Sequence, residues 1–89
     1  MKSIQWSSLK NRRLKETRGV SFEEILQAKL IAKKKHPQLA HQDVMLFYYR
    51  NYIWVVPYIK EENYLFLKTL YPSRKYTKMY KTGKLYEKD

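Results

Sequence analysis

The chain has 89 residues, a formal net charge of +11 and no cysteine. A chain of this length forms one domain with a single modest core, and without cysteine it has no disulfide, thiolate metal ligand or cysteine nucleophile. Aromatic residues make up 16% of the sequence, which is typical of a folded protein rather than a disordered one, and no apolar run is as long as a membrane span.

The charge and the N-terminal sequence indicate where the protein works and what it binds. A field of this sign attracts polyanions, of which nucleic acid is the commonest. The same field attracts an acidic protein, and a membrane surface ranks third because the basic residues do not lie along one long amphipathic helix. The first residues contain no apolar signal-peptide core, and the lack of disulfides fits a reducing compartment, so we expect a cytoplasmic protein.

The first elements are a short strand and a helix. Residues 2–6 fit a strand, and a serine at position 7 or 8 can cap a helix that runs to about residue 17. Gly19 follows where a helix C-terminus favours a left-handed residue.

A second helix is predicted to begin at Ser21. Ser21 and Glu24 have the spacing of a capping box, and Val20 and Ile25 have that of a hydrophobic staple. Lysines 33–35 would lie near the end of this helix, where cations suit the helix dipole, and Pro37 would terminate it. Its apolar face would consist of Phe22, Ile25, Leu26 and Leu30.

The second half of the chain reads as a β-meander. Residues 44–49, 52–59 and 64–70 are rich in aromatic and β-branched side chains, which favours strands. Arg50-Asn51 fits a tight two-residue turn, and Pro57 marks a sheet edge or a bulge because it cannot donate a ladder hydrogen bond.

A short basic helix follows, capped by Ser73 and running to about residue 80, with residues 82–89 as a flexible tail. The sequence therefore predicts one α+β domain over residues 1–89. In it, two N-terminal helices pack on an antiparallel sheet of three to four strands, and a short helix closes the chain.

Two stretches resemble a known family. The first covers residues 6–24 and contains Lys10-Asn11 and the string GVSFEE, and the second covers residues 66–80 and contains Ser73-Arg74-Lys75. In this order and at this distance they resemble the BrnT toxins of bacterial toxin–antitoxin systems, within the RelE-like ribonucleases. Two positions depart from the family pattern, since Trp6-Ser7 stands where members usually have Trp-Asp and Arg18-Gly19 where many have His-Gly.

The resemblance implies an activity and partners. Such toxins are metal-independent endoribonucleases that cleave mRNA and thereby inhibit translation. A cognate antitoxin, often a ribbon-helix-helix DNA binder, holds them inactive, and the toxin contacts operator DNA only through that complex. No cofactor is implied. The two departures from the family pattern favour an alternative, a non-catalytic RNA- or DNA-binding module, and a surface that binds only an acidic protein is a third possibility.

Cleaving RNA without a metal requires three chemical roles. A base takes the proton of the 2′-hydroxyl, cations stabilise the phosphorane-like transition state, and an acid protonates the leaving oxygen. Arginine suits the second role because its planar fork binds phosphate in a bidentate manner, so Arg74 with Lys75, at a helix start, are the first candidates. Arg18 lies at a matched motif position, and His41 can exchange protons near neutral pH, as can His36.

Further residues are candidates for holding RNA. Their cations or aromatic rings suit phosphates or bases, and they are Lys10, Lys15, Lys68, Lys78 and Tyr49. For each basic residue the competing interpretation is an ordinary solvated side chain. Glu23 and Glu24 are better explained as helix-start residues than as a catalytic pair. The two histidines have no cysteine or carboxylate cluster around them, so we expect no metal site.

Overall fold

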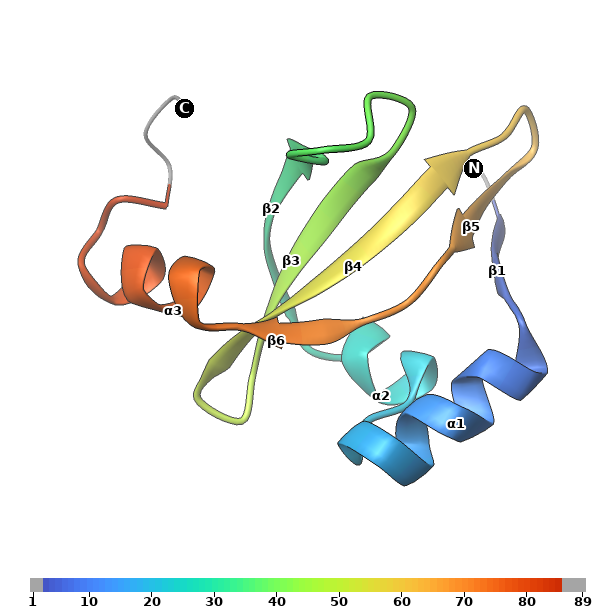
Figure 1. Cartoon of the computed structure of the whole chain (residues 1–89), viewed down its shortest axis with the longest axis horizontal. Coiled ribbons are helices and arrows are strands. Elements are labelled where there is room, and N and C mark those ends of the chain that lie inside the picture. Colours follow the sequence, from blue (N-terminus) through green and yellow to red (C-terminus); the bar gives the residue numbers. More distant parts are fainter. Residues whose placement is uncertain (1–2, 86–89) are drawn as a thin grey trace.

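The structure is a computed structural model that describes residues 3–85 (Figure 1). In chain order its elements are β1 (Ser3–Trp6), α1 (Ser8–Arg18), α2 (Phe22–Leu26), β2 (Lys29–Lys35), β3 (Asp43–Tyr49), β4 (Tyr52–Lys60), β5 (Tyr64–Leu67), β6 (Tyr71–Ser73) and α3 (Arg74–Lys81). The predicted start of the first strand at Lys2 and residues 86–89 of the predicted tail lie outside the described residues.

The strands form one sheet in the order β1-β5-β4-β3-β2. Strand β6 pairs with residues 53–55 of β4, on the side of β4 where β5 pairs with residues 58–60. Strands β3, β4 and β5 form the predicted antiparallel meander, while β1 pairs with β5 in parallel. The α+β class is thus confirmed. The sheet has six strands rather than three to four, because β1, β2 and β6 add to the meander.

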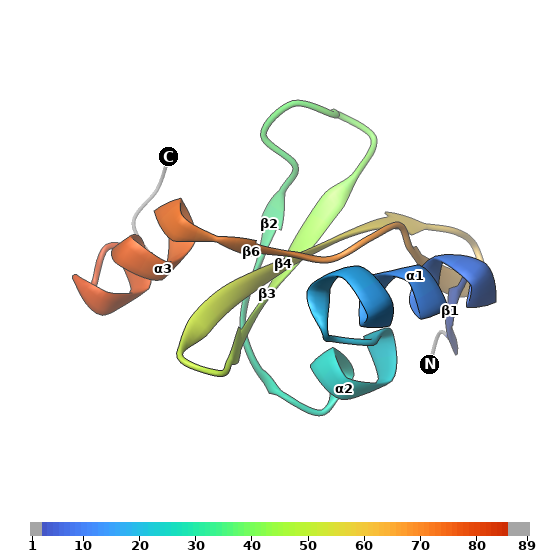
Figure 2. The same cartoon turned by 60° about the horizontal axis from the view of Figure 1, so that its bottom comes forward.

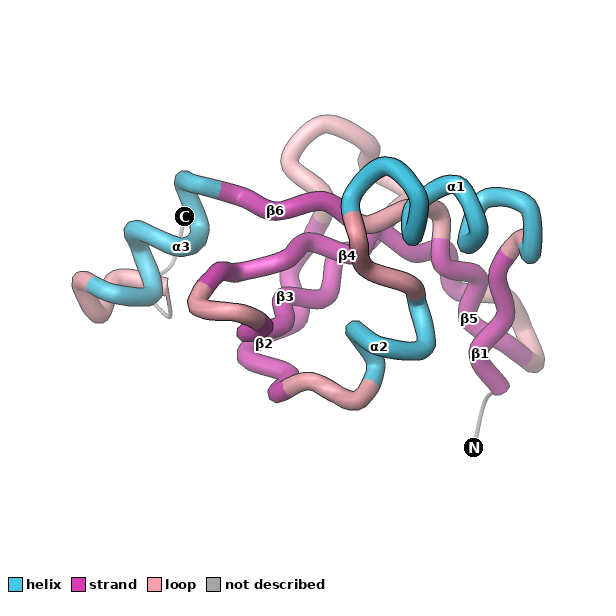
Figure 3. The backbone as a smooth tube through the Cα atoms, turned by 90° about the horizontal axis from the view of Figure 1, so that it is seen from below, coloured by secondary structure: helices cyan, strands magenta, loops and turns pink. Residues whose placement is uncertain are grey.

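Two cores lie on opposite faces of this sheet because side chains alternate along each strand. On one face Met45, Phe47, Trp54 and Val56 pack with residues of α1 and α2, among them Leu14 and Phe22. On the other face Val44, Leu46, Ile53 and Val55 pack with the aromatic side of α3. In every view α3 lies well apart from α1 and α2 (Figures 1, 2 and 3). Burial on both faces explains the nearly continuous apolar sequence of β3 and β4.

The predicted ends of the first helix are confirmed. Ser7 is the N-cap, and its Oγ accepts a hydrogen bond from the backbone N–H of Lys10 at 3.2 Å. Gly19 ends the helix with a φ of 75°, and its N–H donates to the carbonyl oxygen of Lys15 at 3.0 Å. The capping box of Ser21 and Glu24 is also present and starts α2.

The predicted length of the second helix is wrong. Helix α2 ends at Leu26, and lysines 33–35 lie in β2, which pairs with β3 along the edge of the sheet. Leu30, predicted on the apolar helix face, is 44% exposed. Without β2 the apolar strand β3 would be an unprotected sheet edge, and covering it outweighs the helix propensity of the lysine, leucine and alanine residues in this segment.

The turn residues behave as their types predict. Arg50 and Asn51 both have positive φ, 54° and 63°, as a two-residue hairpin turn requires.

The single predicted strand over residues 64–70 is instead two strands, β5 and β6, which residues 68–70 separate. These residues face residues 56 and 57 of β4, which makes a bulge in the ladder. Pro57 lies at this bulge, where its carbonyl oxygen accepts the N–H of Lys68 at 2.8 Å, so its position was predicted correctly.

The last helix begins at its predicted cap, since the Oγ of Ser73 accepts the N–H of Tyr76 at 3.1 Å. The predicted tail is wrong for residues 82–85. Gly83 adopts a φ of 76°, and the N–H of Lys84 donates to the carbonyl oxygen of Met79 at 2.7 Å, which turns the chain back. Leu85 is thereby completely buried in the core beneath α3.

None of the helices within residues 3–85 is long and apolar enough to cross a membrane.

Candidate functional site

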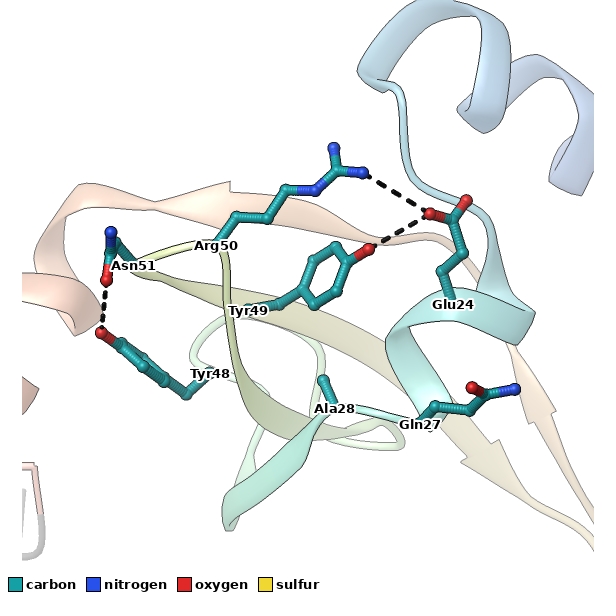
Figure 4. Close-up of a pocket in the computed structure, with 7 residues that line it drawn as sticks. All are labelled: Glu24, Gln27, Ala28, Tyr48, Tyr49, Arg50 and Asn51. Carbon is teal, nitrogen blue, oxygen red and sulfur yellow. Dashed lines mark hydrogen bonds and ion pairs between the residues drawn. The ribbon is translucent and has the colours of Figure 1, made fainter.

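The turn between β3 and β4 meets the N-terminal helices around the carboxylate of Glu24 (Figure 4). Lys15 Nζ donates to Glu24 Oε1 at 2.6 Å. On the other oxygen, the hydroxyl of Tyr49 donates to Oε2 at 3.2 Å, and a guanidinium nitrogen of Arg50 lies 3.7 Å away. One carboxylate therefore connects α1, α2 and the hairpin turn.

These contacts fix the protonation state of Glu24. The hydrogen bond from Lys15 lowers the pKa of Glu24 most, followed by the one from the backbone N–H of Ser21, and together they bring it to about 2. A carboxyl group with this pKa remains ionised near neutral pH and is a weak base there. The geometry supports the interpretation of Glu24 as a structural helix-start residue.

A hollow of about 580 Å³ lies beside this cluster. Its lining residues come from α2, the segment after it and the hairpin turn, and they are Glu24, Gln27, Ala28, Tyr48, Tyr49, Arg50 and Asn51 (Figure 4). The guanidinium of Arg50 lies 5.0 Å from the centre of the Tyr49 ring. The hollow thus combines a cation, aromatic rings and amide groups, a combination that suits the bases and phosphates of RNA.

Asn11, which lies in the resembling stretch over residues 6–24, hydrogen-bonds to the first residues of α2. Its Oδ1 accepts the N–H of Phe22 at 2.7 Å, and its Nδ2 donates to Glu23 Oε1 at 2.6 Å. This second hydrogen bond is the main cause of a lowered pKa of Glu23. Asn11 therefore joins α1 to the start of α2 and positions Lys15 relative to Glu24.

The two stretches that carry the family resemblance lie side by side. Trp6 of β1 pairs with Leu67 of β5, and a guanidinium nitrogen of Arg18 donates to the carbonyl oxygen of Leu70 at 2.8 Å. Arg18 thus attaches the end of α1 to the segment that leads into β6 and α3. This hydrogen bond and the pairing of Trp6 with Leu67 both connect the first stretch to the one that holds Arg74.

Arg74 and Lys75 are the exposed first residues of α3. The residue before them, Ser73, pairs with Ile53, which lies next to the Arg50-Asn51 turn. The predicted phosphate-binding pair therefore begins near the same end of β4 as the hairpin turn. The ammonium of Lys75 lies 5.8 Å from the centre of the Tyr76 ring.

The histidines lie at the other end of the sheet. His36 and His41 belong to the loop between β2 and β3, opposite the hairpin turn (Figure 1). From Asp43 to Tyr48 the strand β3 alone covers roughly 17 Å, at about 3.3 Å per residue. His36 Nδ1 also accepts the N–H groups of Gln38 and Leu39, at 3.0 and 3.1 Å, so it organises its own loop. The structure does not bring His41 together with Arg74.

The predicted RNA-contacting residues divide into separate groups. Lys15 and Tyr49 meet at Glu24, whereas Lys10 is exposed near the start of α1 and Lys78 is exposed on α3. The ammonium of Lys68 lies 5.6 Å from the Phe66 ring, on the sheet face opposite the buried Leu67. These residues do not line one groove.

Arg50 was not singled out from the sequence as a functional residue. Its signal was present but ambiguous, because an arginine in a two-residue turn with a positive φ is an unusual choice. Its contact with Glu24 depends on how the hairpin packs on α2, and no local pattern encodes that. Gln27 was missed for a different reason, because the predicted second helix continued past it, whereas α2 ends at Leu26.

No protein-family model, curated protein or solved structure matches this chain.

Proposed function

We propose that this chain is a BrnT-like toxin, a cytoplasmic, metal-independent endoribonuclease that cleaves mRNA and is neutralised by a cognate antitoxin. The observation that supports it most is the contact between the two resembling stretches, in which Arg18 is bound to the carbonyl oxygen of Leu70. A net charge of +11 supplies the long-range attraction for RNA.

In this proposal Arg74 and Lys75 bind the scissile phosphate. They are exposed, and they begin a helix whose free N–H groups favour an anion. Arg18 supports this site by holding the segment that leads into it. In this proposal a lysine, a tyrosine or His41 transfers the protons, and His41 would have to reach the site by a movement of its loop. The contacts of Glu24 with Lys15, Tyr49 and Arg50 favour a structural role for that residue.

The deciding experiment is cleavage of purified RNA in excess EDTA by the wild type, Arg74→Ala and Arg13→Ala. Arg13 is an exposed arginine of α1, which makes Arg13→Ala a matched control for loss of one charge. We expect cleavage by the wild type and by Arg13→Ala, and a loss of about 10²–10³-fold in rate for Arg74→Ala, the usual effect of removing one preorganised group that stabilises a transition state. Equal rates for the two variants would remove Arg74 from the site.

The second candidate function is a non-catalytic RNA- or DNA-binding module. The separation of both histidines from Arg74 favours it, because a cleavage site needs its acid and base within hydrogen-bonding distance of the reacting oxygens. Under this alternative the folded wild type binds RNA and leaves it intact, with and without ribosomes.

A further inference from the structure

Four lysines, one aspartate and one tyrosine line a second hollow, at the opposite end of the sheet from the hairpin turn. Its volume is about 280 Å³, and its lining residues are Lys33, Lys34, Lys35, Asp43, Tyr58 and Lys60. None of these lysines was among the predicted RNA contacts, because lysines 33–35 were assigned to a helix end and Lys60 lies just outside the predicted strand over residues 52–59.

The strand register explains why these residues meet. Lys35 pairs with Asp43 and Asp43 with Tyr58, so the three form one row across β2, β3 and β4. Lys33 and Lys60 lie two residues along their strands from Lys35 and Tyr58, and therefore on the same face. Tyr58 belongs to the core beneath α1 and α2, and it is only 3% exposed.

The charges of the hollow are unbalanced. Asp43 is bound to Lys35 at 3.2 Å, and within the described residues Lys33 and Lys60 form no ion pair. Lysines gathered on one face repel one another, and a bound anion relieves this repulsion. Burial, and next the charge of Asp43, raise the pKa of Tyr58, so its hydroxyl remains protonated and can donate to an anion.

We propose that this hollow is a phosphate-binding site for single-stranded RNA, separate from the Arg74 end of the molecule. Its lining contains lysines, one carboxylate and one phenol, and no aliphatic side chain. Protein interfaces are depleted in lysine and built around apolar cores, so this lining fits a phosphate better than a protein surface. Lysine is a compact point charge on a flexible stem, which suits a mobile phosphodiester chain. That the phosphate belongs to RNA rests on the proposed function.

The test is the salt dependence of binding of a fluorescein-labelled single-stranded RNA, measured by fluorescence anisotropy. Each phosphate contact to a single strand contributes about 0.7 to the slope of log K against log salt concentration. We expect Lys33→Gln/Lys60→Gln to reduce this slope by about 1.4, and Lys33→Arg/Lys60→Arg to retain it because the charges remain. Lys29→Gln/Lys84→Gln removes the same charge from exposed positions outside the hollow and should leave the slope near that of the wild type.

Inorganic phosphate gives a second measurement that does not depend on RNA. Added to ¹⁵N-labelled protein, it should shift the amide resonances of Lys35, Asp43 and Tyr58, and this shift should be absent in Lys33→Gln/Lys60→Gln.

The outcomes separate this site from the proposed function. If the wild type binds RNA but the Lys33→Gln/Lys60→Gln and Lys29→Gln/Lys84→Gln variants have equal slopes, the site is refuted, while the proposed function still depends on the cleavage assay alone. If the wild type binds no RNA while phosphate shifts these amides, the proposed function and the assignment of the hollow to RNA both fail, and the hollow remains a phosphate site. Polyglutamate serves as a model of an acidic protein partner. If the wild type binds polyglutamate, and Lys33→Gln/Lys60→Gln loses that binding but keeps its RNA slope, the hollow binds an acidic protein and the proposal is overturned.

Discussion

The two oxygens of Glu24 serve different parts of the molecule. Oε1 accepts hydrogen bonds from the backbone N–H of Ser21 and from Lys15, and so completes the capping box of α2 and attaches α1 to it. Oε2 holds Tyr49 and Arg50 of the hairpin. Loss of the negative charge should therefore affect several elements together.

Protonation of Glu24 should destabilise the fold at low pH. Its pKa in the folded protein is about 2, below the ordinary 4.5, so its contribution is complete above pH 4.5 and is lost as the pH falls toward 2. We expect the melting temperature of the wild type to fall over this range and that of Glu24→Gln to fall less, because glutamine has no charge to lose. Thermal unfolding followed by circular dichroism measures this, with the exposed Glu16→Gln as the control. Parallel curves for the wild type and Glu24→Gln would contradict the prediction.

Thr77 supplies a buried hydrogen bond between α3 and β4. Its hydroxyl donates to the carbonyl oxygen of Ser73 at 2.6 Å and accepts the backbone N–H of Ile53 at 2.8 Å. Thr77→Val keeps the shape but leaves the Ile53 N–H unsatisfied, so we expect a loss of about 1–3 kcal/mol in the free energy of unfolding. Urea denaturation provides the value.

A matched control exists for this substitution. The hydroxyl of Thr17 makes the same kind of bond, to the carbonyl oxygen of Arg13 at 2.7 Å, but on the exposed side of α1. Thr17→Val should change the free energy of unfolding by less than about 0.5 kcal/mol. Equal losses for the two variants would show that burial of the Ile53 N–H is not the cause.

Among the helices and turns, the sequence predicted the boundaries that are marked by capping or turn residues. The serine caps and Gly19 satisfy backbone groups at the helix ends, and asparagine tolerates the positive φ of the turn at residues 50 and 51, so these features are visible in the sequence. Strand β2 has no such signal. Its conformation depends on pairing with β3, and the cluster around Glu24 depends in turn on α2 ending before β2 begins.

The turn at residues 50 and 51 should discriminate sharply between residue types. Asn51 has a φ of 63°, where a β-branched side chain is strained, so Asn51→Val should lower the free energy of unfolding by about 1–2 kcal/mol. Asn51→Gly should be nearly neutral, since glycine offsets the lost bond from the Tyr48 hydroxyl by relieving the backbone. Urea denaturation measures both variants. Asn63→Val, in a turn without positive φ, is the control, and a loss there as large as that of Asn51→Val would contradict the argument.

For the whole molecule, the α+β class and the strong positive charge followed from the sequence because they depend on composition and element order alone. The two-sided sheet did not, because it requires knowing which partners β3 and β4 have on each face. Leu85 illustrates the difference, since the chain around it reads as a polar tail while the side chain completes the core beneath α3.

The stability of the sheet should decrease from its centre to its edges. Strands β3 and β4 have hydrogen-bonded neighbours on both sides and packed side chains on both faces, whereas β1 and β2 are edges. We therefore expect hydrogen exchange, followed by NMR, to be slowest for amides in β3 and β4 and fastest, among strands, for β1 and the outward side of β2. Protection of β1 amides as strong as that of β3 would show that the sheet opens only as one unit.

The parallel pairing of β1 with β5 also determines when the fold can be completed. Ser3 is synthesised well before its partner Tyr64, because β5 follows β1 only after two helices and three further strands. The ribosome adds about 5–20 residues per second, so β1 waits for seconds without its partner strand. During that interval β3 and β4 can already cover Leu14 and Phe22 of the helices, whereas β1 and Trp6 have no strand to pair with until β5 has been made.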